Sequence, residues 1–257
     1  MQVLEIVTQE ELQTYVLRLA DNVLILGQQV SAWCGHAPAL EEDIAFANVA
    51  LDLIGQAINW LNYAAILDAK DITADDLAFM RDERDFKNAL LVEQPNADFG
   101  TSLIRQFLFD TYHYYLLGGL VDSKNERIAE IAEKSLKEVT YHLQRTSDLI
   151  VRLGDGTDES HGYMQRALDN LWRFTGELTM ADALDVKMHQ AGIAPDLKQI
   201  EKDILAHMKH VFSLAMLTPP ETSFMQSGGR LGVHSESMGK LLAEMQYLRR
   251  SQPEASW

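Results

Sequence analysis

Residues 40–67 read LEEDIAFANVALDLIGQAINWLNYAAIL, and this stretch decides the fold class that the sequence predicts. Between residues 44 and 67 the formal charge is carried by Asp52 alone. At 100° per residue, four polar side chains share one stripe of a helix: Asn48, Asp52, Gln56 and Asn59. The rest of the circumference is apolar. We therefore predict a central helix that is buried on nearly all sides, with a polar seam turned toward the interior.

The composition favours an all-α protein with a large core. The chain has 257 residues, of which 47% are hydrophobic, so it can bury substantial apolar surface. It contains 6 Pro and 15 Gly and shows no regular Val/Ile/Thr alternation with hairpin turns, which favours helices over strands. The formal net charge of −16 opposes binding to nucleic acid or to an anionic membrane, because both reward basic patches.

Cysteine usage and the N-terminal segment indicate the compartment. A single cysteine, Cys34, excludes an internal disulfide and is typical of a reducing environment. Residues 1–12, MQVLEIVTQEEL, are acidic and lack the basic and apolar regions of a signal peptide. Residues 44–67 are long enough to span a membrane, but their five strongly polar side chains argue against a span. We expect a soluble, cytoplasmic protein.

Start and stop signals outline a first helical hairpin. Thr8 and Glu11 form a capping-box pattern that starts a helix running to about residue 33. The segment WCGHAP (33–38) makes a turn, and the second helix follows to about residue 67. The polar residues 68–97 come next and are long enough to cross the length of a bundle.

A second hairpin completes the predicted bundle. Helices are expected at about 98–121 and 125–153, joined by a short turn, and Gly154 suits a C′ position. Short turn, long crossover and short turn are the connections of a ferritin-like four-helix bundle. Beyond it the pattern predicts further helices at about 158–178, 181–190, 196–216 and 235–250. We expect one ferritin-like domain over 1–257, with the bundle at about 8–153 and a helical extension at about 156–257.

The two hairpins raise the question of a metal site. Residues equally far from the turn of a hairpin lie at one level, because each residue rises about 1.5 Å. Each predicted bundle helix offers one carboxylate at about this level: Asp21, Asp52, Asp110 and Glu138. Ferritin-like carboxylate proteins hold two irons in this way, with Glu-x-x-His on two of the helices. Here Gly55 and Tyr141 stand where the histidines are needed. Carboxylates without these imidazoles bind a di-iron pair poorly.

We interpret these positions as a degenerate site that now forms a polar network. The degenerate ligand positions are Asp21, Asp52, Gly55, Asp110, Glu138 and Tyr141, and the polar seam comprises Asn48, Gln56, Gln106, His113 and His142. No catalytic, cofactor-binding or metal-binding residue is predicted. The alternative is an active di-iron oxidase built from Asp52, Asp110, His113, Glu138 and His142. Asp21 alone has a second interpretation, as a solvated side chain or a partner of Arg18.

Three further groups are interpreted as structural. Asp203, His207 and His210 share a helical face with ligand-like spacing but lie among lysines, as a solvated face would. The segment GGRLG (228–232) lacks the Lys-Ser/Thr of a P-loop and predicts a plain loop. Cys34 adjoins His36 without a second residue to orient the pair, so we interpret it as a packed thiol.

Several blocks, in order along nearly the whole chain, resemble a known family. They are WCGHAP (33–38), ALDLIGQA (50–57), RDERDFKNALLVEQPN (81–96), KEVTYHLQR (137–145), RLGDGTDES (152–160), LWRFTGEL (171–178) and LLAEMQYLRR (241–250). With them the chain resembles the PaaC-like proteins, the C subunits of the bacterial phenylacetyl-CoA 1,2-epoxidase.

The resemblance implies a ferritin-like fold that has lost its metal site and a role as a non-catalytic structural subunit. It implies a catalytic A subunit as partner, in a heterodimer that pairs into a dimer of heterodimers, with di-iron and the acyl-CoA in that subunit. A small B subunit and a reductase with FAD and iron–sulfur, fed by NADPH, are also implied. Such a complex uses O₂ to make the ring 1,2-epoxide in aerobic phenylacetate catabolism. An unrelated helical binding scaffold is the remaining alternative.

Overall fold

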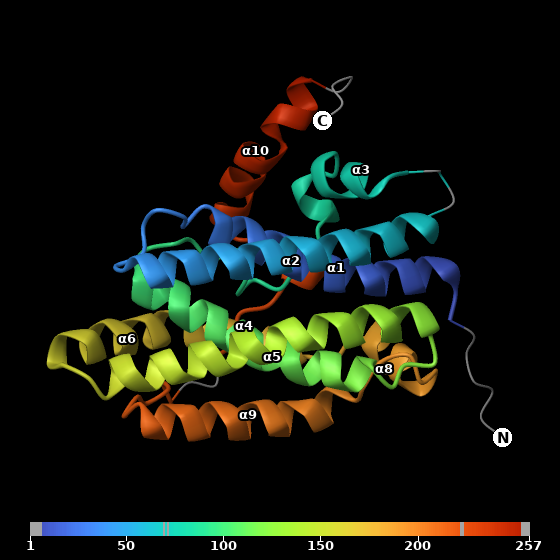
Figure 1. The fold of residues 1–257 in the computed structure, drawn as a ribbon. Helices are drawn as coiled ribbons and strands as arrows, with labels where there is room; N and C mark the ends of the chain where they lie inside the picture. The colour runs from blue at the N-terminus through green and yellow to red at the C-terminus, as the bar shows by residue number, and fades with distance from the viewer. Residues whose placement is uncertain (1–6, 69, 71, 222–223, 253–257) are drawn as a thin grey trace. The chain divides into compact units, whose positions relative to one another are not determined.

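The computed structural model describes residues 7–68, 70, 72–221 and 224–252, and this part of the chain is all-α, without β-strands (Figure 1). The predicted fold class is confirmed. Residues 1–6, part of the segment in which no signal peptide is expected, lie outside the described residues. The helices are α1 (Gln9–Ser31), α2 (Leu40–Ile66), α3 (Ala74–Phe79), α4 (Phe99–Leu120), α5 (Glu126–Gly154), α6 (Asp158–Leu171), α7 (Gly176–Thr179), α8 (Ala183–Gln190), α9 (Leu197–Leu214) and α10 (Glu236–Ser251), with 3-10 turns η1 (Glu83–Asp85), η2 (Trp172–Phe174) and η3 (Gly229–Leu231).

The chain forms two compact units. The α1 unit consists of Thr8–Pro95 with the described residues from Ser227 onward, and it contains α1, α2, α3 and α10. The α4 unit consists of Asn96–Gln226 and contains α4 to α9. The predicted extension is therefore divided between the units, because α6 to α9 belong with α4 and α5 whereas α10 belongs with α1. A single ferritin-like domain over the whole chain stays a prediction.

In the α1 unit, α1 and α2 form the predicted helical hairpin and lie side by side (Figure 1). The expected capping box starts α1: the Glu11 amide donates to Thr8 Oγ1 at 3.2 Å, and the Thr8 amide donates to Glu11 Oε2 at 2.8 Å. Gly27 allows α1 to approach α2 closely. A Cβ there would lie 3.2 Å from both Ile54 Cγ1 and Leu53 Cβ.

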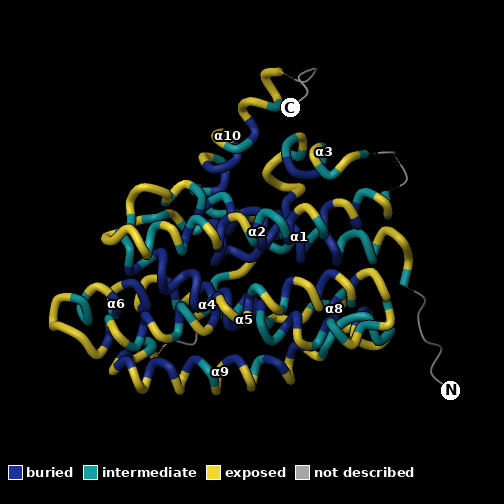
Figure 2. Tube along the Cα trace, in the orientation of Figure 1, coloured by how far each residue is buried: buried dark blue, intermediate teal, exposed yellow. Residues whose placement is uncertain are grey.

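The burial predicted for α2 is wrong on one side of the helix. Leu53, Ala57 and Trp60 are buried as expected, but Leu51 and Ile58 are 68% and 52% exposed. Figure 2 shows exposed and half-buried residues recurring along α2. Hydrophobicity alone cannot distinguish a face that packs inside the chain from an apolar face on its surface. The predicted polar seam is also only partly internal, because Gln56 is buried, Asp52 and Asn59 are half-buried, and Asn48 is exposed.

Among the described residues, α2 alone has the length and hydropathy that would allow a helix to cross a membrane. In the segment that meets this test, 44% of the residues are buried in the protein. A core helix of a soluble protein has the same features, so the helix gives little support to a membrane span.

In the α4 unit, α4 packs against α5, α6 and α9. Aromatic rings fill part of this core, with Phe107 and Trp172 both edge-on to Phe212 at centroid distances of 5.5 and 6.2 Å. Asn125 caps α5 by accepting a hydrogen bond from the Ile128 amide at 3.1 Å.

Two boundary predictions in the α4 unit are wrong for tertiary reasons. Gly154 is the last residue of α5 rather than the residue beyond it, and it is needed because a Cβ would collide with the carbonyl oxygen of Ala215. The helix predicted over 158–178 is divided into α6, η2 and α7. At this break the Arg173 carbonyl accepts a hydrogen bond from the Gln226 amide at 2.8 Å, a partner outside the helix.

Candidate functional site

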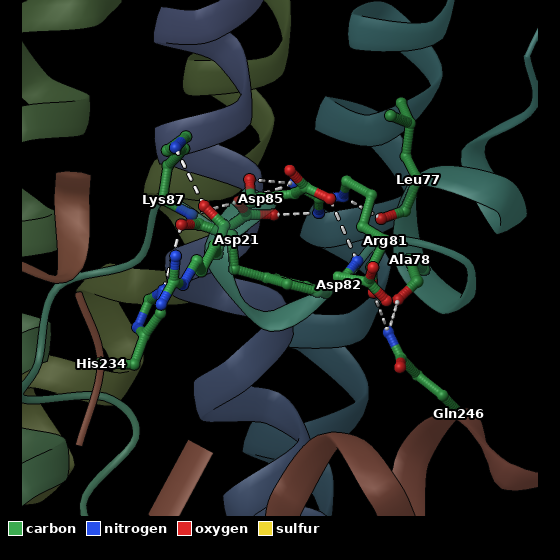
Figure 3. Close-up of polar contacts among 11 residues, drawn as sticks. Asp21, Leu77, Ala78, Arg81, Asp82, Asp85, Lys87, His234 and Gln246 are labelled. Atoms are coloured by element: carbon green, nitrogen blue, oxygen red, sulfur yellow. Dashed lines mark hydrogen bonds and ion pairs between the residues drawn. The ribbon is translucent and has the colours of Figure 1, made fainter. Parts of the chain in front are cut away.

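Asp21 is the carboxylate whose surroundings the structure defines best. It lies on α1 with no exposed surface. Its partner is Arg81, which follows α3 in the long connection (Figure 3). Arg81 Nη1 donates to Asp21 Oδ2 at 3.0 Å, and Nη2 donates to Oδ1 at 2.5 Å. The backbone amide of Lys87 donates to Oδ2 at 2.8 Å. Both oxygens of Asp21 are therefore engaged by donors of the chain itself.

Arg81 is held from several sides. Its Nε donates to the Leu77 carbonyl, and its guanidinium carbon lies 4.1 Å from the centre of the Phe86 ring. Its own carbonyl accepts from Gln246 Nε2 at 2.9 Å (Figure 3) and from Arg250 Nη2 at 2.8 Å. Both donors lie on α10. A planar guanidinium with a bidentate carboxylate is a strong, oriented ion pair. Arg81 thus supplies the positive charge that Asp21 requires when buried.

The positions on α2 are more exposed. Asp52 is half-buried, unlike Asp21. At Gly55, which occupies the position of a histidine in a Glu-x-x-His motif, a Cβ would have no atom within 4 Å. Asn59 Nδ2 donates back to the Gly55 carbonyl at 3.0 Å. Gly55 therefore offers no ligand and leaves an open notch on the surface of α2.

In the α4 unit, Asp110 is the centre of a buried polar cluster. Gln106 Nε2 donates to Asp110 Oδ1 at 2.7 Å, so two members of the predicted polar network are in direct contact. Thr146 Oγ1 lies 3.2 Å from Asp110 Oδ2 and 2.9 Å from the His142 carbonyl. Burial raises the pKa of Asp110 to about 6, although the charge of His142 and the hydrogen bonds from Gln106 and Thr146 oppose the rise.

His113 lies in the same unit as an uncharged, buried ring. Burial, followed by the charge of His142, lowers the pKa of His113 to about 3. Its ring packs 5.0 Å from that of Phe109. Within the described part of the chain, His113 Nδ1 and Gln106 Oε1 are buried without a hydrogen-bond partner. The cluster is therefore only partly satisfied, which makes it costly to bury.

The predicted ligand positions do not come together as a set of metal ligands among the described residues of either unit. Within the ranges that the structure describes, no group of three or more His, Cys, Asp or Glu side chains is arranged to hold an ion. Asp21 is engaged by Arg81, Gly55 offers no ligand, and Tyr141 is 58% exposed on α5. Glu138, three residues earlier, is half-buried. Asp21 and Asp52 belong to the α1 unit, whereas Asp110 and Glu138 belong to the α4 unit.

The remaining candidate groups, on α9 and at Cys34, form no cluster of metal ligands among the described residues. Asp203 and His210 are exposed on α9, as expected of a solvated face. His207 is half-buried instead, with Nε2 3.4 Å from Ser147 Oγ. Cys34 is an exposed thiol rather than a packed one, and its Sγ lies 4.0 Å from an oxygen of Asp43.

The glycines of residues 228–232 serve a close backbone contact, in keeping with the plain loop expected there. A Cβ on Gly229 would collide with the Asn88 carbonyl oxygen, and one on Gly232 would collide with that of Arg84. Gly232 also has a φ of 80°, which a glycine adopts at little cost. The loop is thereby fitted against the connection that contains Arg81.

A second buried ion pair, between Glu93 and His234, was missed from the sequence. Their side chains have no exposed surface, and His234 Nδ1 lies 2.7 Å from Glu93 Oε2. The other ring nitrogen, Nε2, lies 3.1 Å from the Phe86 carbonyl. Glu93 also accepts from Asn88 Nδ2 at 2.9 Å and from the Ser235 amide at 2.6 Å. Because both ring nitrogens face acceptors, both must carry protons, and His234 is an imidazolium.

Residues 2–257 match the family described as "Phenylacetic acid catabolic protein". The chain belongs to this family. A relative from Escherichia coli (strain K12), the C subunit of 1,2-phenylacetyl-CoA epoxidase, is 45% identical over 247 residues, which are 96% of this chain and 99% of the relative. The family indicated by the sequence blocks is confirmed.

In this family member, two of the blocks that carry the resemblance form the contacts around Asp21. RDERDFKNALLVEQPN (81–96) supplies Arg81 and the Lys87 amide, which bind Asp21, and LLAEMQYLRR (241–250) supplies Gln246 and Arg250, which bind the Arg81 carbonyl. These blocks therefore have a structural explanation within the chain.

Proposed function

We propose that this chain is a non-catalytic structural subunit of a multicomponent di-iron monooxygenase that acts in phenylacetate degradation. The family match and the E. coli relative, which belongs to an epoxidase, support the pathway and the reaction, conversion of phenylacetyl-CoA to its ring 1,2-epoxide. The Asp21–Arg81 ion pair supports the non-catalytic part of the proposal. Asp21 occupies one of the predicted ligand positions, and its carboxylate is paired with the guanidinium of Arg81.

The proposed complex assigns the chemistry to other subunits. A catalytic A subunit holds the di-iron centre and the acyl-CoA, and it pairs with this chain in a heterodimer that forms a dimer of heterodimers. A small B subunit and a reductase with FAD and iron–sulfur, fed by NADPH, complete the enzyme in the cytoplasm. Helices that line a polar metal site pack less apolar surface against each other, which lowers their stability. A large interface with a second helical protein buries further apolar surface and compensates for the loss.

The test is to assemble the complex with Asp52→Ala or Glu138→Ala in this chain. We expect each variant complex to keep its iron content and to epoxidise phenylacetyl-CoA within about twofold of the unchanged complex. Iron is measured by mass spectrometry, product by chromatography, and assembly by gel filtration. Asp148→Ala, an exposed carboxylate on α5, is the matched control.

The alternative, an active di-iron oxidase that uses Asp52 and Glu138, makes the opposite prediction. Under it, either variant lowers both the iron content and the activity by a large factor while the complex stays assembled. Stoichiometric iron in the isolated chain would also contradict the proposal.

A further inference from the structure

An apolar stripe of large side chains is exposed along α2. Ile44, Leu51 and Ile58 are 52%, 68% and 52% exposed and follow one another at intervals of seven residues. A seven-residue repeat keeps side chains on one face of a helix and is the spacing with which one helix contacts another. Leu40 and Ile66 continue the exposed apolar surface toward the ends of α2.

Polar side chains beside the stripe are turned back onto α2 itself. Asn62 Nδ2 donates to the Ile58 carbonyl at 2.8 Å, and Asn59 Nδ2 donates to the Gly55 carbonyl at 3.0 Å. Gly55 lies between Leu51 and Ile58 on the same face, and a Cβ there would meet no atom within 4 Å. Gly55 therefore leaves a notch at the centre of the stripe, where the backbone of a partner can come close.

A groove in the α1 unit extends the stripe sideways. It has a volume of about 360 Å³ and lies between α2 and α3. Ile58 and Leu61 line it from α2, and Ala78 and Phe79 line it from α3. The apolar surface is thus wider than one row of side chains.

The size of this surface and the net charge of the whole chain indicate what covers it. Over 27 residues, α2 is about 40 Å long, and a strip about 10 Å wide along it has a footprint of roughly 400 Å². That is about half of the roughly 800 Å² that each partner buries in a stable interface, so the stripe can form the centre of one. A second copy of this chain would bring another net charge of −16, which opposes self-association.

We propose that the α2 stripe, comprising Ile44, Leu51, Gly55 and Ile58, is the contact surface for an apolar helix of a different subunit. This inference rests on the proposed function, which makes that subunit the iron-bearing A subunit. The partner helix lies along α2 and places small residues opposite Gly55.

The experiment measures binding of the purified A subunit to this chain by calorimetry. We expect the double variant Leu51→Glu/Ile58→Glu to weaken binding at least 100-fold, because it places charges in an apolar contact. We expect Gly55→Leu to weaken it at least tenfold by filling the notch. Circular dichroism and thermal unfolding of the isolated variants establish that they are folded.

Two matched controls separate the stripe from general surface effects. Leu205→Glu changes another exposed leucine, 49% exposed on α9. Gly118→Leu changes another helical glycine whose Cβ would have no atom within 4 Å. Both should bind the A subunit within about twofold of the unchanged chain.

The possible outcomes distinguish this inference from the proposed function. Unchanged binding by the folded stripe variants overturns the inference and leaves the proposed function standing. Failure of the unchanged chain to bind the A subunit overturns the proposed function itself. Sedimentation of the isolated chain as a dimer that the double variant dissociates assigns the stripe to a second copy and overturns the inference.

Discussion

At the residue scale, the Asp21–Arg81 pair shows how a buried carboxylate can be kept without a metal. Asp21 is fully buried, and the side chain of Arg81 is 11% exposed. Removing one member of such a pair leaves a charge without a partner in a poorly solvated place, whereas removing both can be nearly neutral. Each of the two charges is therefore compensated mainly by the other and not by solvent.

Replacing Arg81 by Met should lower the free energy of unfolding by about 3 kcal/mol, because the Asp21 carboxylate loses its cation. The loss is measured by urea denaturation. In the double variant with Asp21→Asn, the loss should be smaller than the sum of the two single losses. Arg127→Met, which breaks an exposed pair with Glu130, should cost less than about 0.5 kcal/mol. An effect of Arg81→Met no larger than that of Arg127→Met would contradict the prediction.

The buried cluster around Asp110 makes stability depend on pH. The pKa of Asp110 is raised from 3.8 to about 6, so the folded protein holds this proton more tightly than the unfolded chain does. Its contribution to stability is therefore present below about pH 4 and is lost as the pH rises through about 6. At 1.36 kcal/mol per pH unit, the change approaches roughly 3 kcal/mol.

The variant Asp110→Asn should become more stable relative to the unchanged protein as the pH rises from 4 to 7.5. The difference in free energy of unfolding, measured by urea denaturation at each pH, should change by up to about 3 kcal/mol. The lowered pKa of His113 acts with the opposite sign, since its contribution is lost as the pH falls below 6.5, but it is common to both proteins. With the exposed Asp148→Asn the difference should be flat. A flat difference for Asp110→Asn would show that this carboxyl keeps its ordinary pKa.

At the element scale, glycines in helices have opposite roles according to what lies beside them. Gly154→Ala should destabilise the protein by about 2 kcal/mol, because the new Cβ collides with Ala215 backbone. Gly118→Ala should stabilise it by about 0.5–1 kcal/mol, because open space surrounds the site and alanine favours the helix. Thermal and urea unfolding of both variants check the signs. Destabilisation by Gly118→Ala would contradict this account.

Helix boundaries could be predicted well where local chemistry decides them. Thr8 and Asn125 cap their helices through their own side chains, so the sequence carries the signal. Gly154 and the break within 158–178 depend on Ala215 and Gln226, which are distant in sequence. Such contacts leave no local pattern. The exposed face of α2 was missed for a related reason, because an apolar composition does not say which surface it will contact.

The burial of the candidate site was predicted only in part, and its partners were not predicted. Asp110 was expected in an internal polar network and is buried, whereas Asp21, which could have been a solvated side chain or a partner of Arg18, is fully buried and paired with Arg81. The partner of Asp21 was missed because Arg81 lies in the charged segment RDERDFK, where each charge could equally be solvated. The one available signal was the need of a buried carboxylate for a cation.

At the scale of the whole molecule, the chain returns to the α1 unit after it has formed the α4 unit. His234 joins Glu93 and the Phe86 carbonyl, and α10 then reaches the carbonyls around Arg81. Burial by itself lowers the pKa of His234, but Glu93, the Phe86 carbonyl and the nearby Glu83 together raise it. The stabilisation from His234 is therefore present below its ordinary pKa of 6.5 and is lost as the pH rises through the raised value.

Hydrogen exchange of α10 should report this contact. Corrected for intrinsic rates, protection of Glu236–Ser251 should fall as the pH is raised through the raised pKa of His234, because the ring loses the proton that both acceptors need. In His234→Gln, protection should be weaker and nearly independent of pH. His189→Gln, an exposed histidine on α8, should behave as the unchanged protein. Equal protection of α10 in His234→Gln would show that the pair does not hold the helix.

Because residues from Ser227 onward complete the unit that begins at Thr8, the order of synthesis affects how this unit folds and how truncation damages it. A ribosome releases Asp21 and Glu93 long before His234, Gln246 and Arg250, with all of Asn96–Gln226 in between. At 5–20 residues per second, the first unit waits on the order of ten seconds for its missing piece. During that time it is a substrate for chaperones and proteases. A premature stop codon near the 3′ end of the gene would therefore damage the part of the protein that was translated first.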